Sequence, residues 1–229
     1  MIRIINLCVI LICLTSLACR AQNLVPNPSF EEVNFDVCGL FPNTEKFETS
    51  NKNWLGPTDS TPEIVSEVLN PSCWNYVAPG SRNSPRTGKR AAVILVLDKR
   101  NFRSYLQVEL CRGLKKGRVY VTEIHVRIRP DSQSACNNLG LYFSDSQVRE
   151  KIRSNLNFEP QVNHGEILRD TTGWISLKGK FKATSSAKYL LIGNFYDNEN
   201  TKIERIRYAA GIDPGAIFYF IDDVFVSEE

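Results

Sequence analysis

Hydrophobic and polar positions along the chain follow the period of a β-strand more often than that of a helix. Residues 119–128 alternate throughout, which leaves the polar residues Glu123, His125 and Arg127 on one face of a strand. The set on the opposite face comprises Tyr120, Thr122, Ile124, Val126 and Ile128. We expect that second set to be buried and the polar set to be solvated.

Further runs of β-branched and aromatic residues are bounded by turn-forming residues. They are residues 91–97, 105–110, 139–143, 175–181, 189–195 and 217–226. Such a series of short strands, without heptads or an internal repeat, is typical of a β-sandwich. The length of 229 residues suits one such domain around a single core.

Two segments depart from the strand pattern. Residues 38–84 are rich in Asn, Ser, Pro and Thr and predict long loops, which often carry function. Residues 145–156 have a weak apolar stripe behind a capping residue at Asp145 or Ser146, and predict a short surface helix. The fold expected is therefore all-β, with long loops and at most one or two short helices.

The first residues have the three parts of a signal peptide. Residues 1–5 contain one arginine, residues 7–14 are apolar, and residues 15–21 end in small side chains. Cleavage after Ala21 would release a secreted or periplasmic domain of residues 22–229, whereas the lipobox-like end at Cys19 would instead give an outer-membrane lipoprotein. The apolar run is too short for a transmembrane span, which needs about 20 residues, and no later run is as long as that.

The charge balance argues against nucleic acid as a partner. The chain has 28 basic and 25 acidic residues, and removal of residues 1–21 takes away two of the arginines. The mature domain is then nearly neutral, whereas proteins that bind nucleic acid carry a basic surface.

The cysteines predict disulfides in an exported protein. Of the seven, Cys38, Cys73, Cys111 and Cys136 lie beyond the signal segment. An even number in an oxidising compartment favours disulfides, and of the three possible connectivities we favour Cys38–Cys73 with Cys111–Cys136, because each closes a moderate loop without crossing the other. Free buried thiols are the alternative. A zinc site is not expected, since no C-x-x-C spacing occurs and the chain has two histidines.

The two ends of the mature chain carry a family resemblance. Residues 23–32 (NLVPNPSFEE) and 218–226 (FYFIDDVFV) resemble the first and last strands of jelly-roll carbohydrate-binding modules of the galactose-binding-like type. The opening is also similar to that of a bacterial group found ahead of outer-membrane protein A-like domains in exported proteins. Other similar segments are residues 85–89, 137–144, 170–174 and 192–197. The resemblance implies a jelly-roll β-sandwich that binds a glycan.

The resemblance also implies a structural calcium ion between the terminal strands. Calcium prefers oxygen ligands, and the related modules often hold it there, so we expect Glu31 and Asp222 as side-chain ligands. Neighbouring residues of a strand point to opposite faces, so Asp223 is expected to face away from the ion. Salt bridges or solvation at the strand ends are the alternative.

Candidate ligand-binding residues combine aromatic rings with polar groups, because a sugar offers an apolar ring face and a rim of hydroxyls. The candidates are Trp74, Tyr76, Arg86 and Asn194. Trp74 and Tyr76 flank Asn75 in a polar loop anchored by Cys73, where they would either bind ligand or cap the core. Trp54 and Trp174 are expected to cap the core.

No catalytic motif is present: the sequence lacks a G-x-S-x-G elbow, an H-E-x-x-H helix and a phosphate-binding loop. The function expected is a non-catalytic exported module that binds a cell-envelope or extracellular polysaccharide. One alternative is a structural or adhesive protein that contacts other outer-membrane or envelope proteins. The other is a hydrolase with an unrecognised acidic site, built from carboxylates such as Glu63, Glu67, Asp98 or Glu109.

Overall fold

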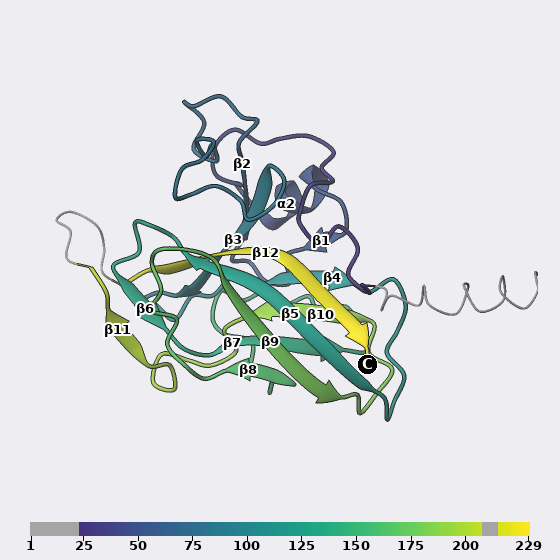
Figure 1. The fold of residues 1–229 in the computed structure, drawn as a ribbon. Coiled ribbons are helices and arrows are strands. Elements are labelled where there is room, and N and C mark those ends of the chain that lie inside the picture. The colour runs from purple at the N-terminus through teal and green to yellow at the C-terminus, as the bar shows by residue number, and fades with distance from the viewer. Residues whose placement is uncertain (1–22, 208–214) are drawn as a thin grey trace, which may run out of the picture.

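The structure is a computed structural model in which residues 23–207 and 215–229 are described (Figure 1). The predicted signal peptide of residues 1–21, with the cleavage site at Ala21 and the alternative lipidation site at Cys19, lies outside the described residues. Within the part of the chain that is described, no helix is long and apolar enough to cross a membrane.

Two antiparallel five-stranded sheets form a sandwich, with a small two-stranded sheet at one end. The elements are helix α2 (Thr44–Ser50) and strands β1 (Trp54–Leu55), β2 (Glu63–Ser66), β3 (Arg90–Leu97), β4 (Leu106–Glu109), β5 (Val119–Ile128), β6 (Ser134–Cys136), β7 (Leu139–Ser144), β8 (Val162–His164), β9 (Ile175–Lys182), β10 (Tyr189–Gly193), β11 (Ile203–Arg205) and β12 (Ile217–Glu228). One sheet has the order β1-β4-β10-β7-β8 and the other β2-β3-β12-β5-β9, while β11 pairs with β6. Figure 1 shows β12, β5 and β9 running side by side in front of β10 and β7.

Successive long strands alternate between the two sheets. Strands β3, β5, β9 and β12 belong to one sheet, and β4, β7 and β10, which follow them in turn along the chain, belong to the other. This crossing at each connection is the arrangement of a jelly roll. The predicted all-β jelly-roll sandwich is confirmed.

The core lies between the sheets, where strand β5 contributes the face that alternation predicts. Tyr120, Ile124, Val126 and Ile128 are all buried. The opposite face of β5 differs from the prediction, because His125 and Arg127 are buried as well. A second apolar cluster accounts for this, since on the outer face of the sheet Val93 and Phe220 pack with Val77 and Trp174 from outside the strands.

The predicted helix at residues 145–156 does not form. This segment runs across the outer face of the other sheet and buries Val148 and Leu156 in a cluster with Leu191. Gln107 holds it there, because its side chain accepts from the Val148 N–H at 2.8 Å and donates to the Val148 carbonyl at 3.2 Å. Tertiary packing therefore outweighs a weak local preference.

The helix of the described chain lies in the segment expected to be loops. Helix α2 begins after Asn43, whose side chain accepts a hydrogen bond from the Lys46 N–H at 2.9 Å. Its one buried aromatic residue, Phe47, packs edge-on against Phe41. The described chain thus has no more short helices than expected, but the helix forms in a different segment from the one predicted.

The two ends of the described chain lie side by side, as the resemblance implies. The Leu24 N–H donates to the Val226 carbonyl at 2.8 Å, and the Val224 N–H donates to the Pro28 carbonyl at 3.0 Å. Residues 23–32 form no regular strand, because Asn27 and Phe30 adopt positive φ angles of 46° and 60°. The segment therefore follows strand β12 only in part.

One of the two predicted disulfides is present. Cys38 and Cys73 are bonded, which confirms that pairing, whereas Cys111 and Cys136 are both free thiols. Cys136 is buried in the core and its backbone N–H donates to the Tyr219 hydroxyl at 3.0 Å, while Cys111 is exposed. The second pairing was wrong because loop length says nothing about where two strand ends lie in the folded sandwich.

Candidate binding site

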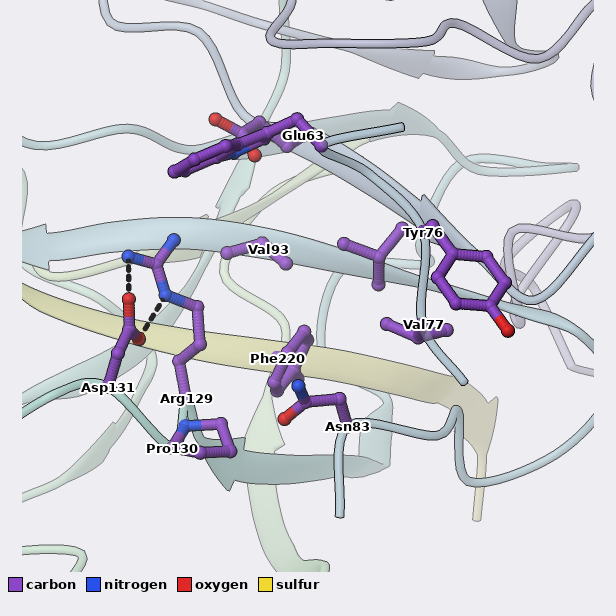
Figure 2. Close-up of a pocket in the computed structure, with 11 residues that line it drawn as sticks. Glu63, Tyr76, Val77, Asn83, Val93, Arg129, Pro130, Asp131 and Phe220 are labelled. Atoms are coloured by element: carbon purple, nitrogen blue, oxygen red, sulfur yellow. Dashed lines mark hydrogen bonds and ion pairs between the residues drawn. The ribbon is translucent and has the colours of Figure 1, made fainter. Parts of the chain in front are cut away.

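A pocket of about 270 Å³ lies on the outer face of the β2-β3-β12-β5 part of the sheet. Its floor is apolar and consists of Val65, Val93 and Phe220, one residue from each of three adjacent strands. Figure 2 shows Val93 and Phe220 on their strands, with Tyr76 at one end of the pocket and the Arg129–Asp131 pair at the other. We call this cavity the Trp74 pocket.

Two aromatic residues from the loop after β2 form its rim. Trp74 is 66% exposed, the largest exposure among the large hydrophobic residues described, and Tyr76 is half-buried. Between them Asn75 is fully buried, and its carbonyl accepts from the Ser66 N–H at 2.8 Å. The loop is thereby tied to strand β2, and the adjacent disulfide at Cys73 anchors it again. Trp74 and Tyr76, two of the predicted ligand-binding residues, thus both line the pocket.

A fixed ion pair supplies polar groups at one end. The Arg129 guanidinium binds Asp131 through two hydrogen bonds of 2.6 and 2.8 Å, and it lies over the Phe218 ring at 3.7 Å from the centroid. Both contacts hold the guanidinium in one orientation. The free edges of this pair are placed to bind a polar ligand without a large loss of side-chain entropy.

Two further polar groups in the pocket have unused hydrogen-bonding capacity. The Glu63 carboxylate makes no hydrogen bond or ion pair with another described residue, and the buried Oδ1 of Asn83 has no partner there either. Burial raises the pKa of Glu63, the charge of Arg129 opposes this, and the charge of Asp131 adds to it. Protein groups of this kind are usually satisfied, so their position in a pocket points to a ligand.

Sequence reasoning did not assign Glu63, Asn83, Arg129 or Asp131 to a ligand site. Glu63 appeared there only as one of several carboxylates for a hydrolase. A signal was available in the position of Arg129 and Asp131 directly after the strongest predicted strand, on the side of its polar residues. Nothing local indicates that the loop with Asn83 folds over this point.

The structure places the remaining predicted ligand residues elsewhere. Asn194 is fully buried, and its side chain donates to the Val96 carbonyl and the Thr201 hydroxyl and accepts from the Tyr196 N–H. Its amide is used within the fold, so it leaves the candidate set. Arg86 does not line the Trp74 pocket, and its guanidinium forms an ion pair with Asp223.

The two predicted calcium ligands approach the same loop. Glu31 Oε1 accepts from the N–H groups of Lys89 and Arg90, each at 2.7 Å. Asp222 Oδ2 accepts from the N–H groups of Arg86 and Thr87 at 2.8 and 3.2 Å. Burial and the neighbouring carboxylate of Asp223 raise the pKa of Asp222 to about 7, although these amides lower it.

Asp223 does not face away from this loop, which corrects the prediction from alternation. Its carboxylate accepts from the Thr87 and Ser29 hydroxyls at 2.7 and 2.5 Å. The reason is a β-bulge: the register of β12 against β5 shifts between Asp222 and Phe225, and Asp223 has a φ of 47°. Two consecutive carboxylates therefore meet the same segment.

No group of three or more His, Cys, Asp or Glu side chains that could hold a metal ion occurs among the residues described. As arranged, the oxygens of Glu31 and Asp222 face N–H donors instead of completing the oxygen cage that calcium prefers. Calcium binding at these residues stays a prediction.

A second hollow, of about 390 Å³, lies beside residues 155–159 and 195–200. It contains Phe158 and Tyr196, but Phe158 stacks on Tyr142 with ring centroids 4.6 Å apart. None of the large hydrophobic residues exposed in the described chain lines it. It therefore lacks the free aromatic surface that Trp74 gives to the first pocket.

No protein-family model and no curated protein matches the sequence. Solved structures with a similar fold include the CBM22-1–GH10 modules of a Clostridium thermocellum endo-1,4-β-D-xylanase complexed with xylohexaose, at a TM-score of 0.45 and 12% identity over 91% of this chain and 29% of that one. They include TmCBM61 in complex with β-1,4-galactotriose, at a TM-score of 0.43 and 15% identity over 91% of this chain and 100% of that one. The CBM22-1 xylan-binding domain from Paenibacillus barcinonensis Xyn10C is similar at a TM-score of 0.43 and 13% identity, over 91% and 95% of the two chains. Identities and TM-scores this low assign no ligand to this chain.

Proposed function

We propose that this chain is an exported, non-catalytic module that binds a polysaccharide of the cell envelope or the extracellular space in the Trp74 pocket. The observation that carries the proposal is the exposure of Trp74, 66%, at the rim of a pocket that also holds polar groups without partners among the described residues. Tryptophan is enriched at binding surfaces, where its large apolar ring and its N–H group can both contact a partner.

The composition of the pocket matches the two sides of a sugar. Trp74 and Tyr76 offer flat apolar surfaces for the C–H face of a pyranose ring. The Glu63 carboxylate and the side-chain Oδ1 of Asn83 can accept hydrogen bonds from hydroxyls. The Arg129–Asp131 pair supplies both donors and acceptors. Buried polar groups that are satisfied only by ligand discriminate strongly between ligands.

The first experiment is a glycan-array screen of the chain without residues 1–21, beside Trp74→Ala and the matched control Ile203→Ala. Ile203 is 50% exposed but lies on β11, outside the pocket. We expect Trp74→Ala to weaken binding at least tenfold and Ile203→Ala to leave it unchanged, with both variants as stable as wild type to within about 0.5 kcal/mol. Equal binding by wild type and Trp74→Ala would place the site elsewhere.

The proposal also includes calcium binding and export, and each of these is tested by its own measurement. A chelator arm of the same screen, with thermal unfolding, tests a structural ion at Glu31 and Asp222, for which a lowered melting temperature is expected. Mass spectrometry of the protein from its own cells distinguishes an N-terminus at Gln22 from an acylated Cys19.

A second candidate function is contact with an envelope protein, which one observation favours. Phe35, Leu40, Val68 and Trp74 are between 41% and 66% exposed, and all lie within a few residues of the Cys38–Cys73 disulfide. Failure to bind any glycan, together with Trp74-dependent retention of an envelope protein, would favour this function.

The same protein samples also test the alternative that the chain is a hydrolase. Glu63, whose pKa is raised, and Asp131, which pairs with Arg129, share the pocket, and glycoside hydrolysis uses two carboxyl groups as acid and base. New reducing ends released from a bound polysaccharide, and lost in Glu63→Gln, would contradict the non-catalytic proposal.

A further inference from the structure

A row of residues on the outer face of the sheet continues from the Trp74 pocket to a buried arginine. Glu63, Val93, Phe220 and Arg127 are paired in register across β2, β3, β12 and β5. Residues directly opposite in antiparallel strands share a face, so Arg127 lies on the face that carries the pocket floor. At a strand spacing of about 4.8 Å the row spans about 14 Å, more than the width of one sugar ring.

Arg127 is buried without a counter-ion. It is 6% exposed, its Nε is buried with no hydrogen-bond partner, and no described residue forms an ion pair or hydrogen bond with its guanidinium. A buried guanidinium is normally paired, because removing its charge from water without compensation costs stability. The fold keeps this one unpaired beside a pocket.

His125 repeats the pattern on the same face, two residues earlier. It is 9% exposed and its Nδ1 has no partner, while its Nε2 is 3.4 Å from Glu123. Asp222 stands opposite His125 in register, but its carboxylate accepts from the amides of residues 86 and 87. Neither Glu123 nor Asp222 therefore forms an ion pair with Arg127.

The electrostatic surroundings of Arg127 are positive. Burial lowers its pKa, as do the charges of Arg82 and Arg207, and only Asp170 opposes them. The Asp170 carboxylate accepts from the backbone and hydroxyl of Thr172, and Arg207 donates to the carbonyl of Pro130. The charges near Arg127 are therefore mostly positive, and none of the described residues supplies a hydrogen-bond acceptor to its guanidinium.

We infer that the outer face of β5 at Arg127, next to Phe220, is a subsite for a negatively charged substituent of the bound polysaccharide, a carboxylate or a sulfate ester. The inference rests on the proposed function and narrows it to acidic polysaccharides. Trp174 packs against Phe220 with ring centroids 6.4 Å apart, which provides an apolar wall beside the charge. A guanidinium binds such oxyanions through paired hydrogen bonds, which are stronger in a site shielded from water.

The test compares acidic polysaccharides with their neutral counterparts. One pair is polygalacturonate and its fully methyl-esterified form, and the other is dextran sulfate and dextran. Wild type is expected to bind the acidic member of at least one pair ten times more tightly, and the pair that responds distinguishes a carboxylate from a sulfate. Arg127→Met keeps the unbranched apolar stem and removes the charge, so it is expected to abolish the preference.

The matched control is Lys116→Gln, which makes the same change of net charge at an exposed turn. It is expected to retain the preference, which excludes a general effect of charge. Equal binding of both members of each pair, or an acidic preference that survives in Arg127→Met, would overturn the inference. The proposed function is tested separately, by the loss of binding in Trp74→Ala.

A second measurement applies even if no polysaccharide binds. In ¹⁵N spectra of arginine Nε–H groups, titration with galacturonate and with sulfate is expected to shift one resonance that is missing in Arg127→Met. Arg127→Met is also expected to unfold at a temperature no lower than wild type, because it removes an unpaired charge. Absence of that shift, or a clear loss of stability in the variant, would assign Arg127 a structural role and overturn the anion subsite.

Discussion

Glu63 combines two properties that rarely coexist in a residue kept for stability. Its carboxyl group is desolvated, and no described protein group donates a hydrogen bond to it. The side chain therefore costs stability in its ionised form, and this cost is reasonable only where a ligand supplies the missing donors.

The raised pKa of Glu63 gives a prediction with a definite sign. The folded chain holds the proton more tightly than the unfolded chain, so the free energy of unfolding falls as the pH rises from the ordinary value of 4.5 through the raised pKa. The glutamine of Glu63→Gln does not titrate, so the free energy of unfolding of this variant does not fall in this way. In urea unfolding we expect the variant to be more stable than wild type near pH 8 and equally stable near pH 3.

Glu67→Gln is the control, since Glu67 lies just beyond the same strand and outside the pocket. It should unfold like wild type at both pH values. A Glu63→Gln variant that is less stable than wild type near pH 8 would mean that the carboxylate has a protein partner, and it would remove one ground for the ligand site.

The loop after β2 is the element that turns a bare sheet face into a pocket. It carries Trp74, Tyr76 and Asn83. It is held by the Cys38–Cys73 disulfide and by the backbone hydrogen bonds that join it to Ser66. The sheet supplies the floor, whereas the loop supplies the rim. Preorganisation of this loop is expected to decide the affinity of the site.

Removal of the disulfide tests that division. The double variant Cys38→Ser/Cys73→Ser is expected to lose about 2–4 kcal/mol of stability, because cross-linking restricts the unfolded chain. Glycan affinity should fall as well, even at temperatures where the variant is fully folded. Calorimetry and binding measured on the same samples separate the two effects, and Cys111→Ser, which alters an exposed free thiol, serves as the control. Unchanged affinity in the folded double variant would show that the β2 loop is positioned by its hydrogen bonds alone.

The β-bulge in β12 has a comparable role at the other edge of this loop. It turns Asp222 and Asp223 toward the same segment. Asp222 accepts hydrogen bonds from the backbone of residues 86 and 87, and Asp223 accepts from their side chains. Regular alternation would have sent one carboxylate to each face of the sheet. The loop is thus fastened at its start by the disulfide and at its end by two carboxylates.

Across the whole molecule, the start of the described chain closes the sandwich against its end. Asn23 donates to the Val224 carbonyl at 2.9 Å and accepts from the Val226 N–H at 3.0 Å, so one side chain continues the edge of a strand that is 201 residues away. These contacts join the first residues that the structure describes to strand β12.

Asn23→Ala is expected to lower the free energy of unfolding by about 1–2 kcal/mol, since two backbone groups of β12 lose their partner. Guanidinium unfolding measures this, with Asn70→Ala as the control, because Asn70 is exposed and its side chain accepts hydrogen bonds only from nearby Ser72. A loss no larger than that of the control would show that water replaces both bonds and that the ends are not coupled through Asn23.

Local pattern was sufficient for much of this protein. The alternation in residues 119–128 predicted strand β5 and its core face, the other apolar runs located the remaining long strands, and an aromatic residue in a polar loop marked Trp74. These features depend on the period of a strand and on the chemistry of single side chains, both of which are present in consecutive residues.

The packing of distant segments decided the rest. Glu63 and Arg129 belong to one site only because β2, β3, β12 and β5 are neighbours, and Arg127 is buried only because the outer face of the sheet is covered. The free thiol of Cys136 and the extended path of residues 145–156 have the same origin. A strand pattern records that a residue has two possible faces, but what lies on each face depends on which distant strands and loops reach it, and that information is not local.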